Sequence, residues 1–267
     1  MEFFGISAQQ ASADLAKYMQ IAPDNIAYDK RRKAYCATPQ LTPALVTPDA
    51  QAYLQGLRAQ GEAGGASGGS FMGWRAPVDV VRMPSRSIAP DVLMRLLWAM
   101  RDGAELQVRY QSMRRPSPTL RWIAPHAFAF DGLRWHARAW CHENHNFRDF
   151  VLSRILEVAA ERPTGIDTTS DAWWHSFVEV VVRPRVGLTT GQRAAIESDF
   201  GMHGGRLVLR SRKALAFYLL RHLRLDRESD EPPAAQPLEL VNSVDLIDVL
   251  AAGRKSPAIP LGSPPAH

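Results

Sequence analysis

Near the N-terminus of this 267-residue chain, a run of cationic side chains follows a segment of small and uncharged polar side chains. Cationic side chains bind the phosphates of nucleic acids, whereas uncharged polar side chains suit the base edges in a DNA major groove. We therefore predict a duplex-DNA contact made by Ser7, Gln9, Gln10, Ser12, Lys17, Lys30, Arg31, Arg32 and Lys33. A solvated helix beside a solvated charge run explains an isolated match of this kind equally well.

A second group of polar side chains lies in a part of the chain that is rich in strand-forming residues. Alternation along a strand places Tyr110 with Ser112, His136 with Arg138, and Arg148 with Arg154 on shared faces if no bulge intervenes. Guanidinium, imidazole and hydroxyl groups together suit a phosphodiester or another anion, such as a nucleotide or an oligonucleotide end. The alternative is that the arginines pair with surface carboxylates, which is their commoner fate. The candidates for that pairing are Glu143, Asp149 and Glu157.

Four potential metal ligands lie within five residues, namely Cys141, His142, Glu143 and His145. Ligands this close together in one turn cannot easily converge on a tetrahedral ion, and no second cluster supplies a missing pair. We expect an exposed polar turn here, with no metal and no cofactor; a metal-dependent nuclease is the least favoured alternative. The chain also lacks a G-x-S-x-G elbow, a P-loop and an H-E-x-x-H motif, so we do not expect an enzyme.

The composition is that of a folded protein of the cytoplasm. Hydrophobic residues make up 46% and charged residues 22%, and the net charge of +5 favours an anionic partner. Cys36 and Cys141 lie far apart, so a disulfide framework is not expected. No apolar run approaches the roughly 18 residues that span a bilayer, and the N-terminus lacks the order of a secretion signal, so no membrane partner is expected.

Helical spacing of apolar residues predicts an amphipathic helix from Ser7 to Met19, with Ser7 as N-cap and Gln10 completing a capping box. Residues 26–28 and 33–36 read as a β-hairpin whose tip is the basic run. A helix followed by a basic hairpin is the second half of a winged helix-turn-helix. A complete one needs two earlier helices, and residues 1–5 leave room only for a turn. The sequence thus predicts either a start further upstream or impaired DNA binding.

Further along, Thr47 and Pro48 are typical of a helix start, and this helix should run to about Leu57. Residues 61–70 have the composition of a flexible tether. A helix is predicted over 91–102, with Val92, Leu93, Leu96, Leu97 and Met100 on its apolar face. Strands are predicted over 105–113, 120–130, 133–140 and 147–158, which together suggest a small closed barrel.

The C-terminal third predicts a compact α/β unit. Strand, helix, strand and helix are expected over 177–182, 190–199, 206–210 and 213–225. Residues 226–239 and 253–267 are rich in proline or polar residues and are expected to be mobile.

Four of these segments resemble successive strands of a WYL domain. They are residues 110–112 (YQS), 123–126 (IAPH), 132–139 (GLRWHARA) and 147–155 (FRDFVLSRI). The segment that gives the family its Trp-Tyr-Leu name reads Trp135-His136-Ala137 here, which is similar to the subgroup that represses phage-defence operons such as BREX and CBASS systems. Residues 6–35 resemble the winged-helix end of that subgroup, and residues 177–225 resemble its dimerising extension.

The resemblance implies an α+β multidomain protein in which an Sm/SH3-like barrel senses a nucleotide or nucleic-acid-derived ligand and a homodimer binds an operator. By position, Tyr110, Ser112, His136, Arg138 and Arg154 match the family's polar pocket, with Arg148 as an addition. The implied parts are a partial winged helix and linker helix (1–60), a tether (61–75), the WYL domain (76–165), a C-terminal extension (172–252) and a tail (253–267). The alternative is an accessory sensor that binds single-stranded nucleic acid without an operator.

Overall fold

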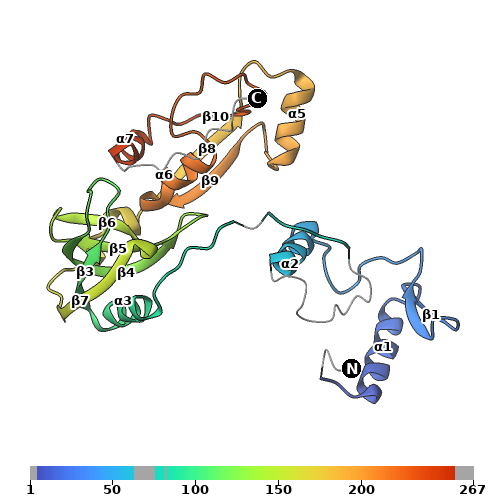
Figure 1. The fold of residues 1–267 in the computed structure, drawn as a ribbon. Coiled ribbons are helices and arrows are strands. Elements are labelled where there is room, and N and C mark those ends of the chain that lie inside the picture. Colours follow the sequence, from blue (N-terminus) through green and yellow to red (C-terminus); the bar gives the residue numbers. More distant parts are fainter. Residues whose placement is uncertain (1–4, 63–75, 82, 256–267) are drawn as a thin grey trace. The chain divides into compact units, whose positions relative to one another are not determined.

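A computed structural model describes residues 5–62, 76–81 and 83–255 of the chain. The chain divides into two compact units, Met1–Pro84 and Ser85–His267 (Figure 1). Within the described ranges, every helix is too short or too polar to cross a lipid bilayer.

The N-terminal unit begins with the predicted helix and hairpin. Helix α1 spans Ala8–Ile21, and strands β1 (Ile26–Asp29) and β2 (Ala34–Ala37) pair antiparallel. Ser7 is the N-cap, as predicted, because its hydroxyl accepts a hydrogen bond from the backbone N–H of Gln10 at 3.1 Å. The side-chain amide of Gln10 donates to Asp14 instead of returning to Ser7, so only half of the predicted capping box forms.

Helix α2 (Ala50–Glu62) starts later and ends later than the sequence predicts. The carboxylate of Asp49 accepts from the backbone N–H groups of Gln51 and Ala52, which makes Asp49 the N-cap and leaves Thr47 and Pro48 outside the helix. The helix includes the first two residues of the predicted tether. Residues 63–75 lie outside the described residues.

A buried asparagine holds the N-terminal unit together. The Asn25 side chain donates to the Tyr18 hydroxyl at 2.8 Å and to the Thr42 carbonyl at 2.6 Å, and it accepts from the Thr42 N–H at 2.9 Å. It thereby ties the last turns of α1 to the segment that follows the hairpin. Among the described residues of this unit, hydrophobic side chains are at most partly buried.

The C-terminal unit starts with helix α3 (Pro90–Asp102) and a curved five-stranded antiparallel sheet. The strands are β3 (Ala104–Tyr110), β4 (Thr119–Phe130), β5 (Trp135–Cys141), β6 (Asn146–Val151) and β7 (Ile155–Pro163), in the order β6-β5-β4-β3-β7. The strands over 120–130 and 133–140 are confirmed with small shifts, whereas the strand predicted over 105–113 ends at Tyr110.

The single strand predicted over 147–158 is wrong. A 3₁₀ turn over Leu152–Arg154 separates β6 from β7, because the chain must pass from one edge of the curved sheet to the other. Leu152 and Ile155 both enter the core across this turn. The turn is fastened to the end of β3, where the Gln111 N–H donates to the Arg154 carbonyl at 3.0 Å and the Val151 N–H to the Tyr110 hydroxyl at 3.3 Å.

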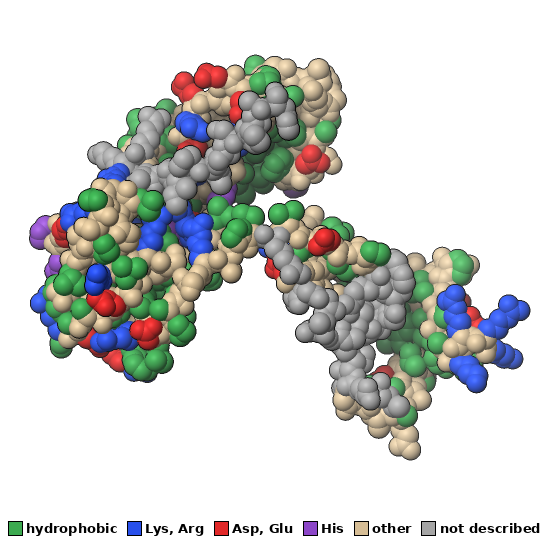
Figure 2. Space-filling view, viewed as in Figure 1, with side chains coloured by type: hydrophobic (Ala, Val, Ile, Leu, Met, Phe, Trp, Pro, Cys, Tyr) green, Lys and Arg blue, Asp and Glu red, His purple; other side chains and the backbone are tan. Residues whose placement is uncertain are grey.

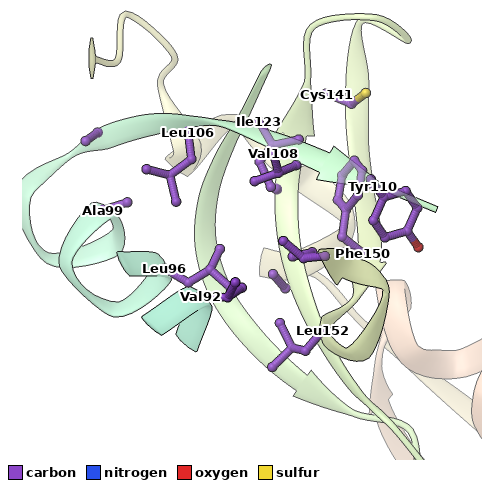
Figure 3. Close-up of a cluster of buried hydrophobic side chains, with 14 residues drawn as sticks. Val92, Leu96, Ala99, Leu106, Val108, Tyr110, Ile123, Cys141, Phe150 and Leu152 are labelled. Atoms are coloured by element: carbon purple, nitrogen blue, oxygen red, sulfur yellow. The ribbon is translucent and has the colours of Figure 1, made fainter. Parts of the chain in front are cut away.

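Strands β6 and β7 are the two edges of the sheet and do not pair in the described residues, so the predicted closed barrel is open between them. The core of this barrel lies between α3 and the inner face of the sheet (Figure 3). From α3 it takes Val92, Leu96 and Ala99, which point toward the strands, while Leu93 and Met100 pack at its margin. Leu97, predicted for the same face, is 49% exposed, because the buried stripe follows the helix through Ala99 instead.

The rest of the C-terminal unit is a smaller α/β module. The predicted strands and helices correspond to β8 (Phe177–Pro184), α5 (Thr190–Asp199), β9 (Leu207–Arg212) and α6 (Lys213–His222). The sequence did not predict the 3₁₀ turn Thr168–Ser170, α4 (Ala172–His175), β10 (Leu238–Leu240) or α7 (Ile247–Lys255). The sheet order is β10-β8-β9, and α6 and α7 supply buried side chains to its core.

Two details show how closely this module is packed. A Cβ on Gly253 of α7 would lie 1.9 Å from the Phe217 ring of α6, so a glycine is required where the two helices meet. Part of the segment 226–239, predicted to be mobile, makes fixed contacts: Gln236 is buried, and its amide donates to the Leu223 carbonyl at 3.0 Å.

Candidate nucleic-acid interface and ligand site

The predicted DNA-contacting side chains of α1 lie on its exposed side. Gln9, Gln10, Ser12 and Lys17 are exposed, and the half-buried stripe runs through other positions, namely Ala11, Leu15, Tyr18 and Met19. The hydroxyl of Ser12 donates to the Ala8 carbonyl at 2.9 Å. The exposed side of α1 is therefore polar and mostly uncharged.

The hairpin tip carries the four cationic side chains, and all of them are exposed (Figure 2). The tip is shaped by Asp29, whose carboxylate accepts from the backbone N–H groups of Arg31 at 2.8 Å and Arg32 at 3.1 Å. These hydrogen bonds lower the pKa of Asp29 below its usual value. Lys33 adopts a positive φ of 51°, which closes the turn into β2. The tip is a short, fixed loop with its positive charge facing solvent.

The six residues predicted to bind a ligand come from several elements, namely β3 and the segment after it, β5, β6 and the 3₁₀ turn. Tyr110 is a buried core residue whose ring packs edge-on against Phe150 with 5.1 Å between centroids. Ser112 follows the end of β3, where its oxygen accepts from the Arg114 N–H at 3.2 Å. The predicted shared strand face of Tyr110 and Ser112 is therefore wrong, because β3 has already ended.

His136 and Arg138 do share a face of β5, as predicted. Because Ala137 and Ala139 point into the barrel core, His136 and Arg138 point away from it. Arg138 is buried and donates to Asp171 through Nε at 2.7 Å and through Nη2 at 3.0 Å. Its Nη1 donates to Asp149 on β6 at 3.1 Å. A guanidinium with two carboxylate partners is tied into the fold.

Arg148 and Arg154 lie in different elements, so their predicted common face does not exist. Arg148 is exposed on β6, with its Nε bonded to the Asn146 side chain at 2.8 Å. Alternation puts it on the same side of the strand as Phe150 and opposite Asp149. Arg154 is half-buried in the 3₁₀ turn, and within the described residues its guanidinium has no partner.

Sequence reasoning missed the carboxylates that organise this region. Asp171 caps α4, binds Arg138 and lies 3.0 Å from Nε2 of His126. Burial acts to raise the pKa of Asp171, but the Arg138 guanidinium, together with the Trp174 N–H and His126, brings it below its usual value. The only signal in the sequence is the position of Asp171 before a short helical segment, which does not indicate its distant partner.

A second carboxylate, Asp131, occupies the β4–β5 turn. Its side chain accepts from the N–H groups of Leu133 and Arg134 and lies 2.8 Å from Nε2 of His136. Burial opposes ionisation, yet these hydrogen bonds lower the pKa of Asp131. The other ring nitrogen of His136, Nδ1, is buried and has no hydrogen-bond partner in the described part of the chain.

The barrel and the α/β module are joined by direct contacts between side chains of the two parts. The Tyr218 hydroxyl on α6 donates to Asp149 on β6 at 3.0 Å, and its ring lies 5.2 Å from that of His136. Burial raises the pKa of Tyr218, and the Asp149 carboxylate raises it further, so the hydroxyl stays protonated. The face of β5 predicted to hold a ligand is thus the face that contacts the C-terminal module.

Three of the four candidate metal ligands at the β5–β6 turn are engaged in protein contacts, and the fourth, His145, is exposed. His142 pairs with Glu105, Glu143 pairs with Arg115 and Arg121, and the Cys141 thiol lies 3.3 Å from the Asn144 side chain. Over residues 5–62, 76–81 and 83–255, three or more such ligands nowhere converge.

Three family models match the chain in succession. The BrxR transcriptional regulator winged helix-turn-helix domain matches residues 1–59, the WYL domain matches residues 91–160, and the BrxR transcriptional regulator C-terminal dimerization domain matches residues 177–246. Together with the fold, they define a multidomain α+β transcriptional regulator of the WYL class. The resemblance inferred from the strand motifs is confirmed.

Relatives over most of the chain are DNA-binding transcriptional repressors named CapW. The protein of Stenotrophomonas maltophilia is 44% identical over 92% of this chain and 83% of its own length. Those of Escherichia coli (strain KTE188) and Pseudomonas aeruginosa are 38% and 36% identical over 93% of this chain and 84% of their own lengths. The chain belongs to the CapW family of DNA-binding transcriptional repressors.

Proposed function

We propose that this chain is a homodimeric repressor of a defence-related operon, which binds duplex operator DNA and is regulated by an anionic, nucleotide-like ligand of its barrel. The observation that carries the proposal is the exposed four-cation hairpin tip that follows α1, a helix whose exposed side is polar. The CapW relatives and the dimerisation-domain match support it. This is a binding and regulatory function without turnover, exercised on DNA in the cytoplasm.

The two parts of the DNA interface have different tasks. Lys30, Arg31, Arg32 and Lys33 supply charge without sequence preference, because they meet phosphates. Gln9, Gln10, Ser12 and Lys17 supply specificity, because amide and hydroxyl groups can read base edges. Ser7 fixes the start of α1 as its cap, and it can reach a phosphate only through the hydroxyl hydrogen.

The charge contribution is tested by the double variant Arg31→Ala with Arg32→Ala, measured by mobility shift on the gene's own promoter. Affinity should fall by about tenfold or more on operator and scrambled duplex alike, and the slope of log affinity against log salt should flatten by about 2. The matched control, Arg206→Ala with Arg227→Ala, removes two exposed arginines from the other unit and should change neither.

Unchanged binding by the Arg31/Arg32 variant would show that the hairpin tip does not contact DNA. If the unaltered protein binds no duplex but retains single-stranded oligonucleotides, the accessory-sensor function replaces the repressor.

For the ligand, Arg154 is the best-placed candidate of the predicted set. It is half-buried and has no partner among the described residues, whereas Arg138 already binds two aspartates. A partly buried guanidinium binds a phosphate more strongly than an exposed guanidinium does, because water screens the charges less. Ser112 and Arg148 remain candidates for the same ligand, while Tyr110 and His136 are proposed to shape its surroundings.

The contacts of β6 suggest how a ligand could alter DNA binding. Arg148 is followed directly by Asp149, which binds Arg138 of the barrel and Tyr218 of the dimerisation module. A ligand that moves β6 therefore changes the strength of the Asp149–Tyr218 hydrogen bond. Regulation requires that the ligand bind the DNA-binding conformation of the protein and the non-binding conformation with unequal affinity.

This route is tested with 5′-phosphorylated dinucleotides and short single-stranded oligonucleotides as probes of operator affinity. Arg154→Ala should bind operator normally and lose the response. Tyr218→Phe should still bind the probe, yet its operator affinity should no longer change, because only the connecting hydroxyl is removed. A full response in both variants would contradict the proposed site and route.

A further inference from the structure

One face of the C-terminal sheet carries largely exposed side chains, and Trp174 of α4 contacts this face at Arg212. Cross-strand register pairs Phe177 with Arg212, Glu179 with Arg210, and Val181 with Val208. Val178, Val180 and Val182 point into the module's core, so these three pairs lie on the opposite face. We call these six residues the β8–β9 face.

The apolar part of the β8–β9 face is more exposed than a folded monomer requires. Phe177 is 46% exposed and Val208 is 53% exposed, although both are strand residues of a sheet whose other side is a packed core. Apolar side chains that are aligned on one open sheet face are typical of an interaction surface.

The charged side chains of the β8–β9 face are one glutamate and two arginines, Glu179, Arg210 and Arg212. Glu179 and Arg210 are exposed and face each other in register, yet no ion pair joins them to one another or to any other residue of the described part of the chain. Arg210 and Arg212 instead lie over the Phe177 ring, at 4.3 and 5.0 Å from its centroid. The Arg212 guanidinium also donates to the Trp174 carbonyl at 2.5 Å, so the guanidinium that can still donate to a carboxylate is that of Arg210.

This pattern selects the partner. A nucleic acid fits poorly, because Glu179 in the middle of the face would repel phosphates. A second copy of the same face fits well. A two-fold axis that brings Glu179 of one protomer to Arg210 of the other also brings Arg210 of the first to Glu179 of the second. A face that carries a glutamate next to an arginine is therefore complementary in charge to a second copy of itself.

We propose that the β8–β9 face is the centre of the homodimer interface, with Glu179 of each protomer bound to Arg210 of the other across a two-fold axis. Phe177 and Val208 pack around this pair of ion pairs. The inference rests on the proposed homodimeric repressor, and it adds the face and the residues that join the two copies.

Charge reversal tests the proposal with the full-length protein, by light scattering after size exclusion. Glu179→Arg alone and Arg210→Glu alone should each be monomeric at concentrations where the unaltered protein is dimeric, because each places like charges across the axis. An equimolar mixture of the two variants should form heterodimers, since both cross-axis pairs become one arginine and one glutamate. The double variant should also be dimeric.

The matched control is Asp245→Arg, which reverses an exposed charge in the same module and should stay dimeric. If a reversal variant fails to fold, Glu179→Gln and Arg210→Gln replace it, and each should raise the dimer dissociation constant by at least tenfold. Dimeric single variants, or a mixture that stays monomeric, would overturn the proposed face.

The same measurements separate this inference from the proposed function. If the unaltered protein is monomeric and binds no operator, the homodimeric repressor itself fails. If it is dimeric, binds operator and keeps its dimer affinity in both reversal variants, only the β8–β9 face is wrong.

Discussion

The two units of the chain are stabilised by different means. In the C-terminal unit, two hydrophobic clusters are buried, and a network of aspartates, arginine and tyrosine joins the barrel to the α/β module. In the described residues of the N-terminal unit, the buried Asn25 side chain makes the hydrogen bonds that join its segments. Little apolar area is buried there, and the charged hairpin tip and the polar side of α1 are exposed.

This difference indicates a division of labour. Apolar burial stabilises a fold in proportion to the area removed from water, so the C-terminal unit should carry most of the folding free energy. A surface that reads DNA must keep its polar groups free for phosphates and bases, and such groups cannot also be used for internal contacts. Substitutions in the two units should therefore differ in which measurement they change.

The largest contrast is expected between Leu96→Ala and Ile21→Ala. Leu96 is fully buried between α3 and the sheet, and its truncation should lower the free energy of unfolding by about 3 kcal/mol. Ile21 is 58% exposed at the end of α1, and its truncation should cost less than about 0.5 kcal/mol.

Denaturant unfolding should be followed by tryptophan fluorescence, because most tryptophans lie in the C-terminal unit. These are Trp98, Trp122, Trp135, Trp140, Trp173 and Trp174. Circular dichroism on the same samples reports on both units. Equal losses for Leu96→Ala and Ile21→Ala would show that the described exposure of α1 does not hold in solution, and the contrast between the units would fail.

A similar loss is expected for Asp171→Asn, which tests the polar network of the C-terminal unit. The carboxylate is buried and accepts two hydrogen bonds from Arg138, so its neutralisation leaves the guanidinium short of charge compensation. We expect a loss of about 3 kcal/mol in the free energy of unfolding. Asp167→Asn, at an exposed cap of a 3₁₀ turn, is the control and should be nearly silent. A silent Asp171→Asn would make the network dispensable.

Acid should weaken the C-terminal unit in two steps. Burial lowers the pKa of His126 despite the nearby Asp171 carboxylate, so the unfolded chain takes up this proton first and stability falls below about pH 6.5. The pKa values of Asp131 and Asp171 are also lowered in the folded state. Their contribution is complete above about pH 4 and is lost as the pH falls further.

The two steps can be separated by measuring the free energy of unfolding between about pH 7.5 and pH 3. His126→Gln should flatten the curve between about pH 7 and 5 and leave the acid limb in place. A curve that is unchanged by this variant would assign the upper step to another group.

Local patterns in the sequence were sufficient to predict most elements. The N-cap of α1, the hairpin over Ile26–Ala37 and the helix α3 depend on neighbouring residues, and all three are present. The break between β6 and β7 could not be read in the same way. Residues 147–158 keep the composition of one strand, and only the passage between the two sheet edges forces the 3₁₀ turn.

The site was harder to predict because its arginines are defined by distant partners. Arg138 and Arg154 look alike in the sequence, yet one is buried between Asp149 and Asp171 and the other has no partner in the described ranges. Asp171 lies 33 positions from Arg138, and no periodicity links them. Alternation along a strand identifies which side chains share a face, but it does not show which of them are engaged in hydrogen bonds or ion pairs within the protein.

The smallest effect on global unfolding, and the most specific one, is expected for Asn25→Ala. Its loss leaves the Thr42 N–H and the Tyr18 hydroxyl without their buried partner, at a cost of about 1 kcal/mol confined to the N-terminal unit. Hydrogen exchange at the Thr42 amide should accelerate several-fold, and operator affinity should fall because α1 is no longer fixed to the hairpin segment.

Tryptophan-detected unfolding should not change in Asn25→Ala, since the C-terminal unit keeps its core. Asn144→Ala, in the exposed turn between β5 and β6, is the matched control and should leave the Thr42 amide and the operator affinity as they are. If Asn25→Ala instead lowered the tryptophan-detected stability, the two units would unfold as one. Their separate roles in folding and in DNA binding would then have to be replaced by a single cooperative structure.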